Sequence, residues 1–208
     1  MDKQERTREV YNEYYGSKNY YWTKSPSPMC YRILQMCPPT RPLKLLDLGC
    51  GEGRNSIFFA RNGYEVHACD ISDIGIEKTK ALASEAGVEV NAFQANLEEY
   101  RLTEKYDILF STGTFQAISP GLRKEIFDNY KEQTNIDGIH AFSTFVRKPF
   151  IDRAPDADPN SYEWLTGELL SKYSDWKIEY CSEDIFDCMS SGVPHKHAMS
   201  RVIAKRVS

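Results

Sequence analysis

Residues 43–56 read LKLLDLGCGEGRNS, an apolar run followed by three glycines at alternate positions. The apolar run predicts a buried strand, and the glycines predict a tight loop that leads into a helix. A second apolar run, Glu65 to Cys69, ends at the acidic residue Asp70. A strand, a glycine loop, a helix and a second strand that ends in a carboxylate are typical of a nucleoside-cofactor site, because the carboxylate accepts hydrogen bonds from ribose hydroxyls.

The spacing of the glycines indicates which cofactor this site binds. Dinucleotide sites usually have the spacing G-x-G-x-x-G and hold a pyrophosphate, whereas this loop has G-x-G-x-G, with Asp47 two residues before Gly49. An acid at that place repels a phosphate but suits a ligand with an ammonium group. S-adenosylmethionine has an ammonium group, a ribose and no phosphate, so we predict that it is the cofactor.

Composition and charge indicate a globular protein that binds neither nucleic acid nor membrane. The chain has 208 residues, 41% of them hydrophobic, which suits one globular domain. The net charge of -4 gives no general attraction to nucleic acid, so none is expected as a partner. No stretch is long and apolar enough for a membrane span, and the first residues lack a signal-peptide core, so we expect a cytoplasmic chain. The six cysteines contain no C-x-x-C pair and are expected to be reduced thiols.

Apolar periodicity predicts alternating strands and helices along the chain. Helices are expected at residues 2–15, 29–36, 55–62, 72–85, 122–134 and 166–173, and strands at 43–48, 65–69, 88–94, 106–111, 139–146, 176–185 and 199–205. This alternation implies a mostly parallel sheet with helices on both faces. Only a loop, Asp187 to Ala198, joins the last two strands, so we expect them to be antiparallel.

The run from Leu46 to Ser56, with Asp70 after the next strand, resembles class I S-adenosylmethionine-dependent methyltransferases. The order Gly53-Arg54-Asn55-Ser56, the aromatic N-terminal segment and the small size are similar to the tellurite-resistance methyltransferase group. The resemblance implies a Rossmann-like, doubly wound α/β fold. Its seven-stranded sheet would have the order 3-2-1-4-5-7-6, with the seventh strand antiparallel. It would form a single domain, 1–208, with an N-terminal helical and aromatic segment at 1–40 and the core at 41–208.

The resemblance also assigns roles to individual residues. Asp47 would help to position the methionyl ammonium group, Asp70 would bind the ribose, and Asn96 would hydrogen-bond the adenine amino group. Gly49 and Gly51 would pass beneath the cofactor, and Ser111 and Thr112 would lie beside the sulfonium. The full set of expected cofactor-binding residues is Tyr20, Trp22, Asp47, Gly49, Cys50, Gly51, Arg54, Asn55, Asp70, Ile71, Ala95, Asn96, Leu97, Ser111 and Thr112.

Several of these residues also have a purely structural interpretation. Asn96 is a common residue in turns, and Arg54 fits the solvated first turn of a helix. The aromatic residues Tyr20, Tyr21 and Trp22 suit either core packing or a lid that folds over the cofactor. For the substrate pocket we expect three residues that follow the fourth and fifth strands: Phe115, Phe145 and Arg147.

Two histidines near the C-terminus, His195 and His197, are candidates for a catalytic base or an anion contact. Because they are two residues apart, they share a face if the segment is extended. Sequence spacing offers no third or fourth metal ligand beside them, so no metal is predicted.

The sequence therefore predicts a methyltransferase for a small soluble acceptor, such as a small metabolite, a thiol or a metalloid oxyanion, in a monomer or homodimer. Two alternatives stay open. One is a non-catalytic, cofactor-binding or regulatory protein of the same fold, and the other is a nicotinamide-dependent oxidoreductase, against which the missing G-x-x-G spacing argues.

Overall fold

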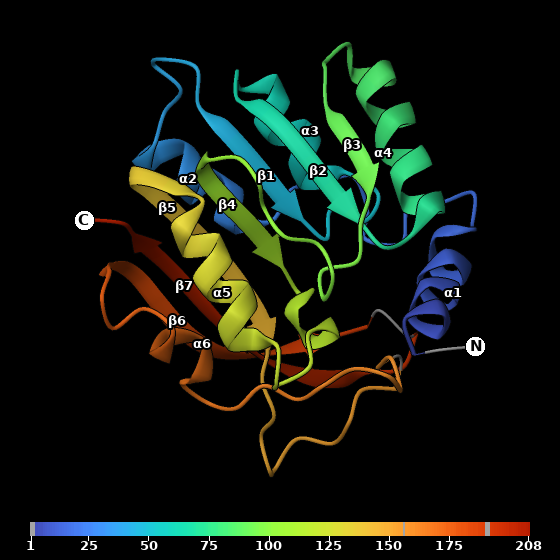
Figure 1. The fold of residues 1–208 in the computed structure, drawn as a ribbon. Coiled ribbons are helices and arrows are strands. Elements are labelled where there is room, and N and C mark those ends of the chain that lie inside the picture. The colour runs from blue at the N-terminus through green and yellow to red at the C-terminus, as the bar shows by residue number, and fades with distance from the viewer. Residues whose placement is uncertain (1–2, 156, 190–191) are drawn as a thin grey trace.

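A single seven-stranded sheet forms the centre of the computed structural model, which describes residues 3–155, 157–189 and 192–208. The strands lie in the order β3-β2-β1-β4-β5-β7-β6 (Figure 1). Their bounds are β1 (Lys44–Leu48), β2 (Glu65–Asp70), β3 (Asn91–Gln94), β4 (Tyr106–Thr112), β5 (Thr134–Phe145), β6 (Lys177–Cys188) and β7 (His195–Lys205). β7 runs antiparallel to both of its neighbours, whereas the pairs among β1 to β5 are parallel. The predicted strand order and the reversed seventh strand are confirmed.

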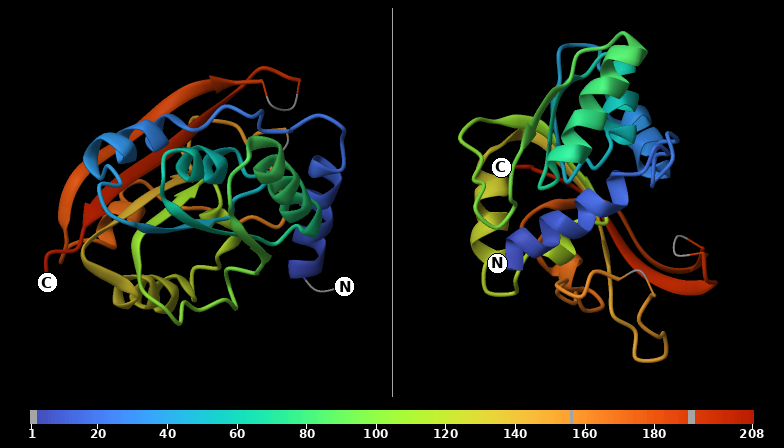
Figure 2. Two further views of the ribbon diagram at one scale, coloured as in Figure 1. Left: turned by 90° about the horizontal axis from the view of Figure 1, so that it is seen from above. Right: turned by 90° about the vertical axis from the view of Figure 1, so that its right-hand side faces the viewer.

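Helices cover both faces of the sheet because successive strand residues point to opposite sides. Leu45 packs in one cluster with α2 (Pro28–Met36) and α3 (Arg54–Arg61), and Leu46 packs in another with α5 (Arg123–Glu132). The remaining helical elements are α1 (Lys3–Tyr15), α4 (Asp73–Ala86), η1 (Phe115–Ala117) and α6 (Glu168–Ser171). α1 lies beside α4, near the end of the sheet to which the parallel strands point (Figures 1 and 2). None of the described helices combines the length and the apolar character needed to cross a bilayer.

The predicted caps of α4 are present at both ends. The Ser72 hydroxyl accepts a hydrogen bond from Gly75 N–H at 2.9 Å and donates to Asn12 Oδ1 at 2.6 Å. Gly87 ends the helix with a φ of 66°, which glycine adopts without steric cost. Ser72 therefore stabilises α4 and also holds α1 against it.

Replacing Ser72 by alanine is expected to lower the free energy of unfolding by about 1–2 kcal/mol, because the cap and the contact to α1 are both lost. Urea denaturation measures the change. The exposed Ser84 near the end of the same helix offers a matched serine, and Ser84→Ala is expected to have no effect beyond a few tenths of a kcal/mol. An equal loss in the two variants would contradict the capping role.

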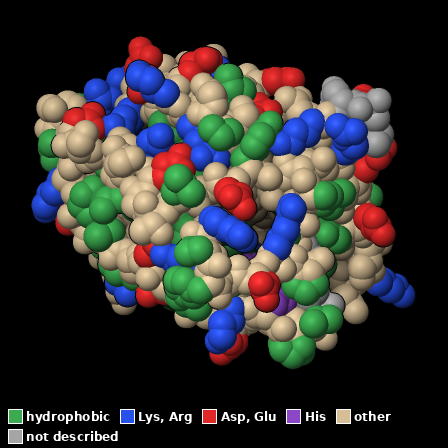
Figure 3. All heavy atoms as spheres, turned by 90° about the horizontal axis from the view of Figure 1, so that it is seen from below, with side chains coloured by type: hydrophobic (Ala, Val, Ile, Leu, Met, Phe, Trp, Pro, Cys, Tyr) green, Lys and Arg blue, Asp and Glu red, His purple; other side chains and the backbone are tan. Residues whose placement is uncertain are grey.

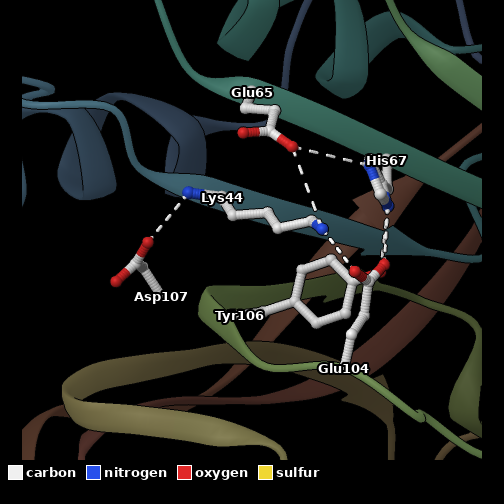
Figure 4. Close-up of polar contacts among 6 residues, drawn as sticks. All are labelled: Lys44, Glu65, His67, Glu104, Tyr106 and Asp107. Atoms are coloured by element: carbon white, nitrogen blue, oxygen red, sulfur yellow. Dashed lines mark hydrogen bonds and ion pairs between the residues drawn. The ribbon is translucent and has the colours of Figure 1, made fainter.

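A polar network joins β1, β2 and β4 at the opposite end of the sheet (Figure 4). Lys44 Nζ lies between Glu65 and Glu104, and the Tyr106 hydroxyl donates to Glu104 at 2.8 Å. His67 Nδ1 lies 2.9 Å from the same hydroxyl, and burial lowers the pKa of this histidine. The network links strands that are distant in sequence, at the end away from the glycine loop.

The C-terminal hairpin is longer than predicted. The expected loop Asp187 to Ala198 is wrong, because β6 continues to Cys188 and β7 begins at His195. Register pairs continue beyond the packed core, with Phe186 opposite His197 and an ion pair between Lys196 and Asp187 at 2.6 Å. Cross-strand contacts of this kind stabilise strands whose sequence shows no regular apolar alternation.

Three other predicted elements differ from the structure. β3 begins at Asn91, three residues after the predicted start. The helix expected at 166–173 is reduced to the four residues of α6. Thr166 does not cap it, because its hydroxyl accepts a hydrogen bond from Lys148 Nζ at 2.8 Å, and Gly167 precedes the helix with a φ of 75°. β5 begins at Thr134, five residues before the predicted start, with a register shift where it pairs with the beginning of β4.

Candidate functional site

A cavity of about 1000 Å³ lies at the carboxyl ends of β1, β2, β4 and β5. α1, the following aromatic segment and the long connection after β5 all contribute to its wall. Figure 3 shows a hollow on this side of the molecule, with Lys and Arg side chains around it and histidine atoms visible in and beside it. Ligands of open α/β sheets bind at this edge of the sheet, so the cavity is the candidate site.

The glycine loop after β1 can be formed only by residues without side chains. Gly49 and Gly51 have φ angles of 75° and 56°, in the left-handed region. A Cβ atom at Gly49 would lie 2.2 Å from the Thr114 side chain, and one at Gly51 would lie 2.9 Å from Tyr15 Oη. The loop backbone therefore lies directly against residues of the cavity wall.

Asp70 holds the glycine loop to the end of β2. Its Oδ2 accepts a hydrogen bond from Gly51 N–H at 2.8 Å, and its Oδ1 accepts one from Ser72 N–H at 2.9 Å. The side chain lines the cavity although the residue is only 7% exposed, and burial raises the pKa of the Asp70 carboxyl to about 6. Each carboxylate oxygen has a second lone pair, so Asp70 can accept further hydrogen bonds from a ligand.

Asp47 lies behind the loop and does not line the cavity. Only 1% of the residue is exposed, and its Oδ2 accepts a 2.6 Å hydrogen bond from the Ser56 hydroxyl. Oδ1 is buried and has no hydrogen-bond partner among the described residues. Burial raises the pKa of Asp47 to about 7, although the Ser56 hydrogen bond and the Arg54 charge act in the opposite direction.

Asn96 combines the two interpretations that the sequence left open. Its Oδ1 accepts a hydrogen bond from Glu98 N–H at 3.0 Å, as in an Asx turn. Its Nδ2 is buried at the cavity and has no hydrogen-bond partner among the described residues. Asn96 therefore shapes the turn and also presents an unpaired donor to the cavity.

The aromatic segment after α1 is divided between the cavity and the core. Trp22 lines the cavity and is fixed through its backbone, because Arg54 donates to its carbonyl at 2.9 Å and its N–H donates to Glu52 at 3.3 Å. Tyr21 stacks on Tyr14 of α1 with ring centroids 4.9 Å apart. Tyr20 instead packs against a small cluster that includes Leu82, away from the cavity. Its prediction as a cofactor-binding residue is corrected accordingly.

Most of the predicted site residues lie together at the cavity. Those that line it are Trp22, Gly49, Cys50, Gly51, Arg54, Asn55, Asp70, Ile71, Ala95, Asn96, Leu97, Thr112, Phe145, Arg147 and His197. Those that do not are Tyr20, Asp47, Ser111, Phe115 and His195.

The structure corrects the predictions for Ser111 and Phe115. The Ser111 hydroxyl is buried and donates to the Leu48 carbonyl at 2.7 Å, so it points into the sheet. Phe115 is fully buried and packs edge-to-face on Phe142 with ring centroids 4.7 Å apart. The chain turns at Gly113, whose φ is 67°, and the short helix η1 that follows directs Phe115 into the core.

Sequence reasoning missed three tyrosines of α1 that line the cavity, Tyr11, Tyr14 and Tyr15. Their spacing of three and four residues puts them on one helix face, which is the only signal that could have identified them. Burial raises the pKa of Tyr11 and of Tyr15. Both therefore remain protonated and contribute hydroxyl groups to the wall.

Cys188 was also missed as a neighbour of the two histidines. It lies directly opposite His195 in the β6–β7 hairpin, and with His197 the three ligand atoms lie within 4.8 Å of one another. The premise that this histidine pair lacks a third possible ligand is therefore wrong. Strand register, rather than sequence spacing, brings the cysteine to the pair.

Comparisons with known proteins agree with this geometry. The family model described as "Tellurite resistance protein TehB" matches residues 10–192. A curated relative from Haemophilus influenzae, "Probable S-adenosyl-L-methionine-dependent methyltransferase TehB", is 27% identical over 170 residues, which cover 80% of this chain and 58% of the relative. The hemagglutinin 1 of Eikenella corrodens is 29% identical over 137 residues, which cover 66% of this chain and 45% of that protein. The chain thus spans less than two thirds of the length of these relatives.

Solved structures share the fold. The crystal structure of TehB from Haemophilus influenzae superposes with a TM-score of 0.76 at 21% identity, over 96% of this chain and 66% of that chain. A structure titled "Conversion of a Disulfide Bond into a Thioacetal Group during Echinomycin Biosynthesis" gives a TM-score of 0.71 at 16% identity, over 99% of this chain and 92% of that one. Because the family model matches most of the chain, and the fold and the glycine loop agree with it, this chain belongs to the TehB tellurite-resistance protein family.

Proposed function

We propose that this chain is an S-adenosylmethionine-dependent methyltransferase that acts on a small soluble acceptor. The observation that carries the proposal is the Asp70 carboxylate, which lines the cavity while it holds Gly51 N–H of the glycine loop. Its remaining lone pairs suit the two hydroxyls of a ribose. The TehB relatives from Haemophilus influenzae, which are named as probable S-adenosylmethionine-dependent methyltransferases, support the same cofactor.

The adenine end of the cofactor fits the wall near Asn96. Because Asn96 Oδ1 is engaged by Glu98 N–H, the side chain offers its Nδ2 as a donor. We therefore expect Asn96 Nδ2 to donate a hydrogen bond to a ring nitrogen of adenine. This replaces the expectation that Asn96 hydrogen-bonds the adenine amino group. Ile71 and Leu97 add apolar surface on the same wall.

The charge around the loop fits an ammonium group better than a pyrophosphate. Asp47 and Asp70 lie behind and beside the glycines, and their carboxylates would repel a phosphate. Arg54 lines the same part of the cavity, and its guanidinium can offset the carboxylate of an amino-acid tail.

When bound, S-adenosylmethionine supplies a methyl group on a sulfonium, which is transferred by in-line displacement. Thr112 and Gly113, at the end of β4, form the wall where the acceptor would be held in line with that methyl group. Trp22 and Tyr21 line the cavity and would exclude water from the bound cofactor. Positioning of this kind can supply roughly 7–11 kcal/mol of the acceleration.

Two basic residues on the acceptor side of the cavity have acidic partners. Arg201 pairs with Asp184 at 2.6 Å, and Lys148 pairs with Glu183. The acceptors to test first are those that arrive as their own nucleophile, such as a thiolate or a metalloid oxyanion, because they require no strong general base. The family description makes tellurite the first oxyanion to test.

S-adenosylhomocysteine at 100 times its dissociation constant is expected to stabilise the chain by about 2.7 kcal/mol, by mass action. For a chain of this size the melting temperature should then rise by roughly 5–10 °C. A thermal melt measures the shift, and NADH at the same concentration serves as the control, with no shift expected.

Transfer of a labelled methyl group to thiols, selenite and tellurite then tests the reaction. A shift with S-adenosylhomocysteine together with a labelled product supports the proposal. A shift without transfer to any small acceptor would favour the non-catalytic alternative. A shift with NADH alone would replace the proposal with an oxidoreductase.

A further inference from the structure

The C-terminal hairpin brings three metal-ligating side chains to one face. Cys188 at the end of β6 is the register partner of His195 at the start of β7, and His197 follows two residues later on the same face. One ligand atom from each of the three lies within 4.8 Å of the others. All three residues are half-buried.

The hydrogen bonding of His195 defines its tautomer. Its Nδ1 lies 2.8 Å from the Val193 carbonyl oxygen, which can only accept, so Nδ1 carries the proton. In the neutral ring Nε2 therefore has a lone pair, and it lies 3.0 Å from Nε2 of His197. Metal-binding histidines commonly have this arrangement, in which the other ring nitrogen donates to a backbone carbonyl.

The distances suit a tetrahedral ion. Two nitrogens bound to zinc at about 2.0–2.1 Å lie roughly 3.3 Å apart, close to the separation of the two Nε2 atoms. A sulfur and a nitrogen on the same ion lie roughly 3.6 Å apart. Since the three ligand atoms are already within 4.8 Å of one another, they need to approach by only about 1 Å to reach this separation, and the fourth position of the ion is left for water or a ligand.

Aromatic packing fixes the position of this cluster relative to the cavity. The His197 ring lies against Phe145, with centroids 4.6 Å apart, and against Phe186 at 5.7 Å. The same Phe145 ring lies 3.3 Å from the Cβ position of Gly113, at the end of β4. Cys188 and His197 both line the cavity, so an ion bound by them would be open to its acceptor side.

We propose that Cys188, His195 and His197 form a binding site for a divalent transition metal, zinc in the first place, at the rim of this cavity. A thiolate and two imidazoles are the ligands that zinc prefers, and together they disfavour magnesium and calcium. Binding of the ion requires loss of the Cys188 thiol proton and a neutral His197 whose Nε2 is free of its proton. The proposal concerns metal binding alone and does not depend on methyl transfer.

Cobalt(II) is the probe that reports the ligands directly. The purified chain is stripped with a chelator, kept reduced with a phosphine, and titrated with cobalt(II) without any cofactor. We expect saturation at one equivalent, a thiolate-to-cobalt charge-transfer band in the near ultraviolet, and displacement of cobalt by zinc.

Variants then assign the ligands. Cys188→Ser is expected to abolish the charge-transfer band. His195→Gln and His197→Gln should each weaken zinc binding by more than about 100-fold, since even loss of a residue that only orients a ligand costs about 10–100-fold. Cys181→Ser is the matched control, because Cys181 is an exposed cysteine of the same strand outside the cluster, and it should bind cobalt and zinc like the unaltered chain.

The proposal is overturned if the unaltered chain shows no saturable uptake of cobalt or zinc, which would leave the two histidines as a hydrogen-bonded pair without a metal. It is also overturned if Cys188→Ser retains the charge-transfer band. Each variant should still melt cooperatively and should still be stabilised by S-adenosylhomocysteine. These two results show that the variant has lost a metal ligand and not its fold. If a variant fails to fold, the unaltered chain is tested before and after alkylation of its cysteines. The thiolate-to-cobalt charge-transfer band should be present before alkylation and absent after it.

Discussion

Asp70→Ala is expected to weaken binding of S-adenosylhomocysteine by at least about 100-fold. Hydrogen bonds to a charged group contribute roughly 1.5–3 kcal/mol each, and the variant would remove the acceptor for two ribose hydroxyls. It would also release Gly51 N–H and Ser72 N–H, which Asp70 holds at 2.8 and 2.9 Å. Isothermal titration calorimetry measures the affinity, and the thermal shift described above should largely disappear.

A nearby acid provides the control for Asp70. Asp73 lies three residues later, is exposed and accepts a hydrogen bond from Asn12 at 2.8 Å. Asp73→Ala should leave the affinity unchanged within about twofold. An analogue of the ligand that lacks both ribose hydroxyls separates loss of the ribose contact from disorder of the glycine loop. If Asp70 acts through the ribose, the unaltered chain and Asp70→Ala should bind this analogue equally well. If the loop is disordered in the variant, Asp70→Ala should bind the analogue more weakly. Tight binding of S-adenosylhomocysteine by Asp70→Ala would contradict the assignment.

The alternation of strands and helices and the position of Asp70 beside the glycine loop could be predicted from local signals, whereas the order of the sheet came from the family resemblance. The apolar run before the glycine loop defines β1, and the acid at the end of the next run must then lie beside that loop. Gly49 and Gly51 likewise have φ angles that only glycine adopts easily. Each of these features is determined within a few residues.

Side-chain direction beyond a strand end could not be predicted in the same way. Phe115 was expected in the substrate pocket because it follows β4, yet Gly113 and η1 turn it into the core. Tyr20 and Trp22 are two residues apart in the same aromatic segment, but only Trp22 reaches the cavity. These directions depend on how the segment docks on the rest of the fold, which local propensity does not encode.

The Cys188–His195–His197 cluster could not be predicted from sequence because it depends on hairpin register. A shift of one residue in the pairing of β6 and β7 would move Cys188 to the opposite face. Both strand ends mix polar and apolar residues and lie outside the buried core, so no regular apolar alternation indicates that pairing continues there. The ion pair of Lys196 with Asp187 and the ring of Phe186 on His197 supply the missing contacts.

Asp47→Asn is expected to stabilise the cofactor-free chain at alkaline pH. Burial raises the pKa of Asp47 from 3.8 to about 7. Between these two pH values the Asp47 carboxyl is therefore protonated in the folded state and ionised in the unfolded state. The contribution of the protonated Asp47 carboxyl to the free energy of unfolding is fully present below pH 3.8, and it is lost as the pH rises through 7. The ionised carboxylate then costs roughly 4 kcal/mol at pH 8, of which roughly 2–3 kcal/mol arises above pH 5.

Urea denaturation between pH 5 and pH 8 measures this effect. The free energy of unfolding of Asp47→Asn should exceed that of the unaltered chain by a margin that grows by roughly 2–3 kcal/mol over this range. Asp70 has a raised pKa as well, and its burial is the same in both chains, so only its coupling to Asp47 differs between them. Asparagine keeps an oxygen for the Ser56 hydroxyl, so the 2.6 Å hydrogen bond can persist in the variant.

The same substitution should weaken binding of S-adenosylhomocysteine by about tenfold above pH 7, because the ammonium group of the ligand loses a nearby carboxylate. For the unaltered chain the affinity should rise with pH through 7, as Asp47 ionises, whereas the affinity of Asp47→Asn should follow only the titration of Asp70 at about pH 6. Asp73→Asn, at an exposed acid, should change neither quantity. A stability margin that stays constant from pH 5 to pH 8 would mean that Asp47 is already ionised at pH 5. The buried carboxylate is therefore expected to stabilise the bound state at the expense of the empty one.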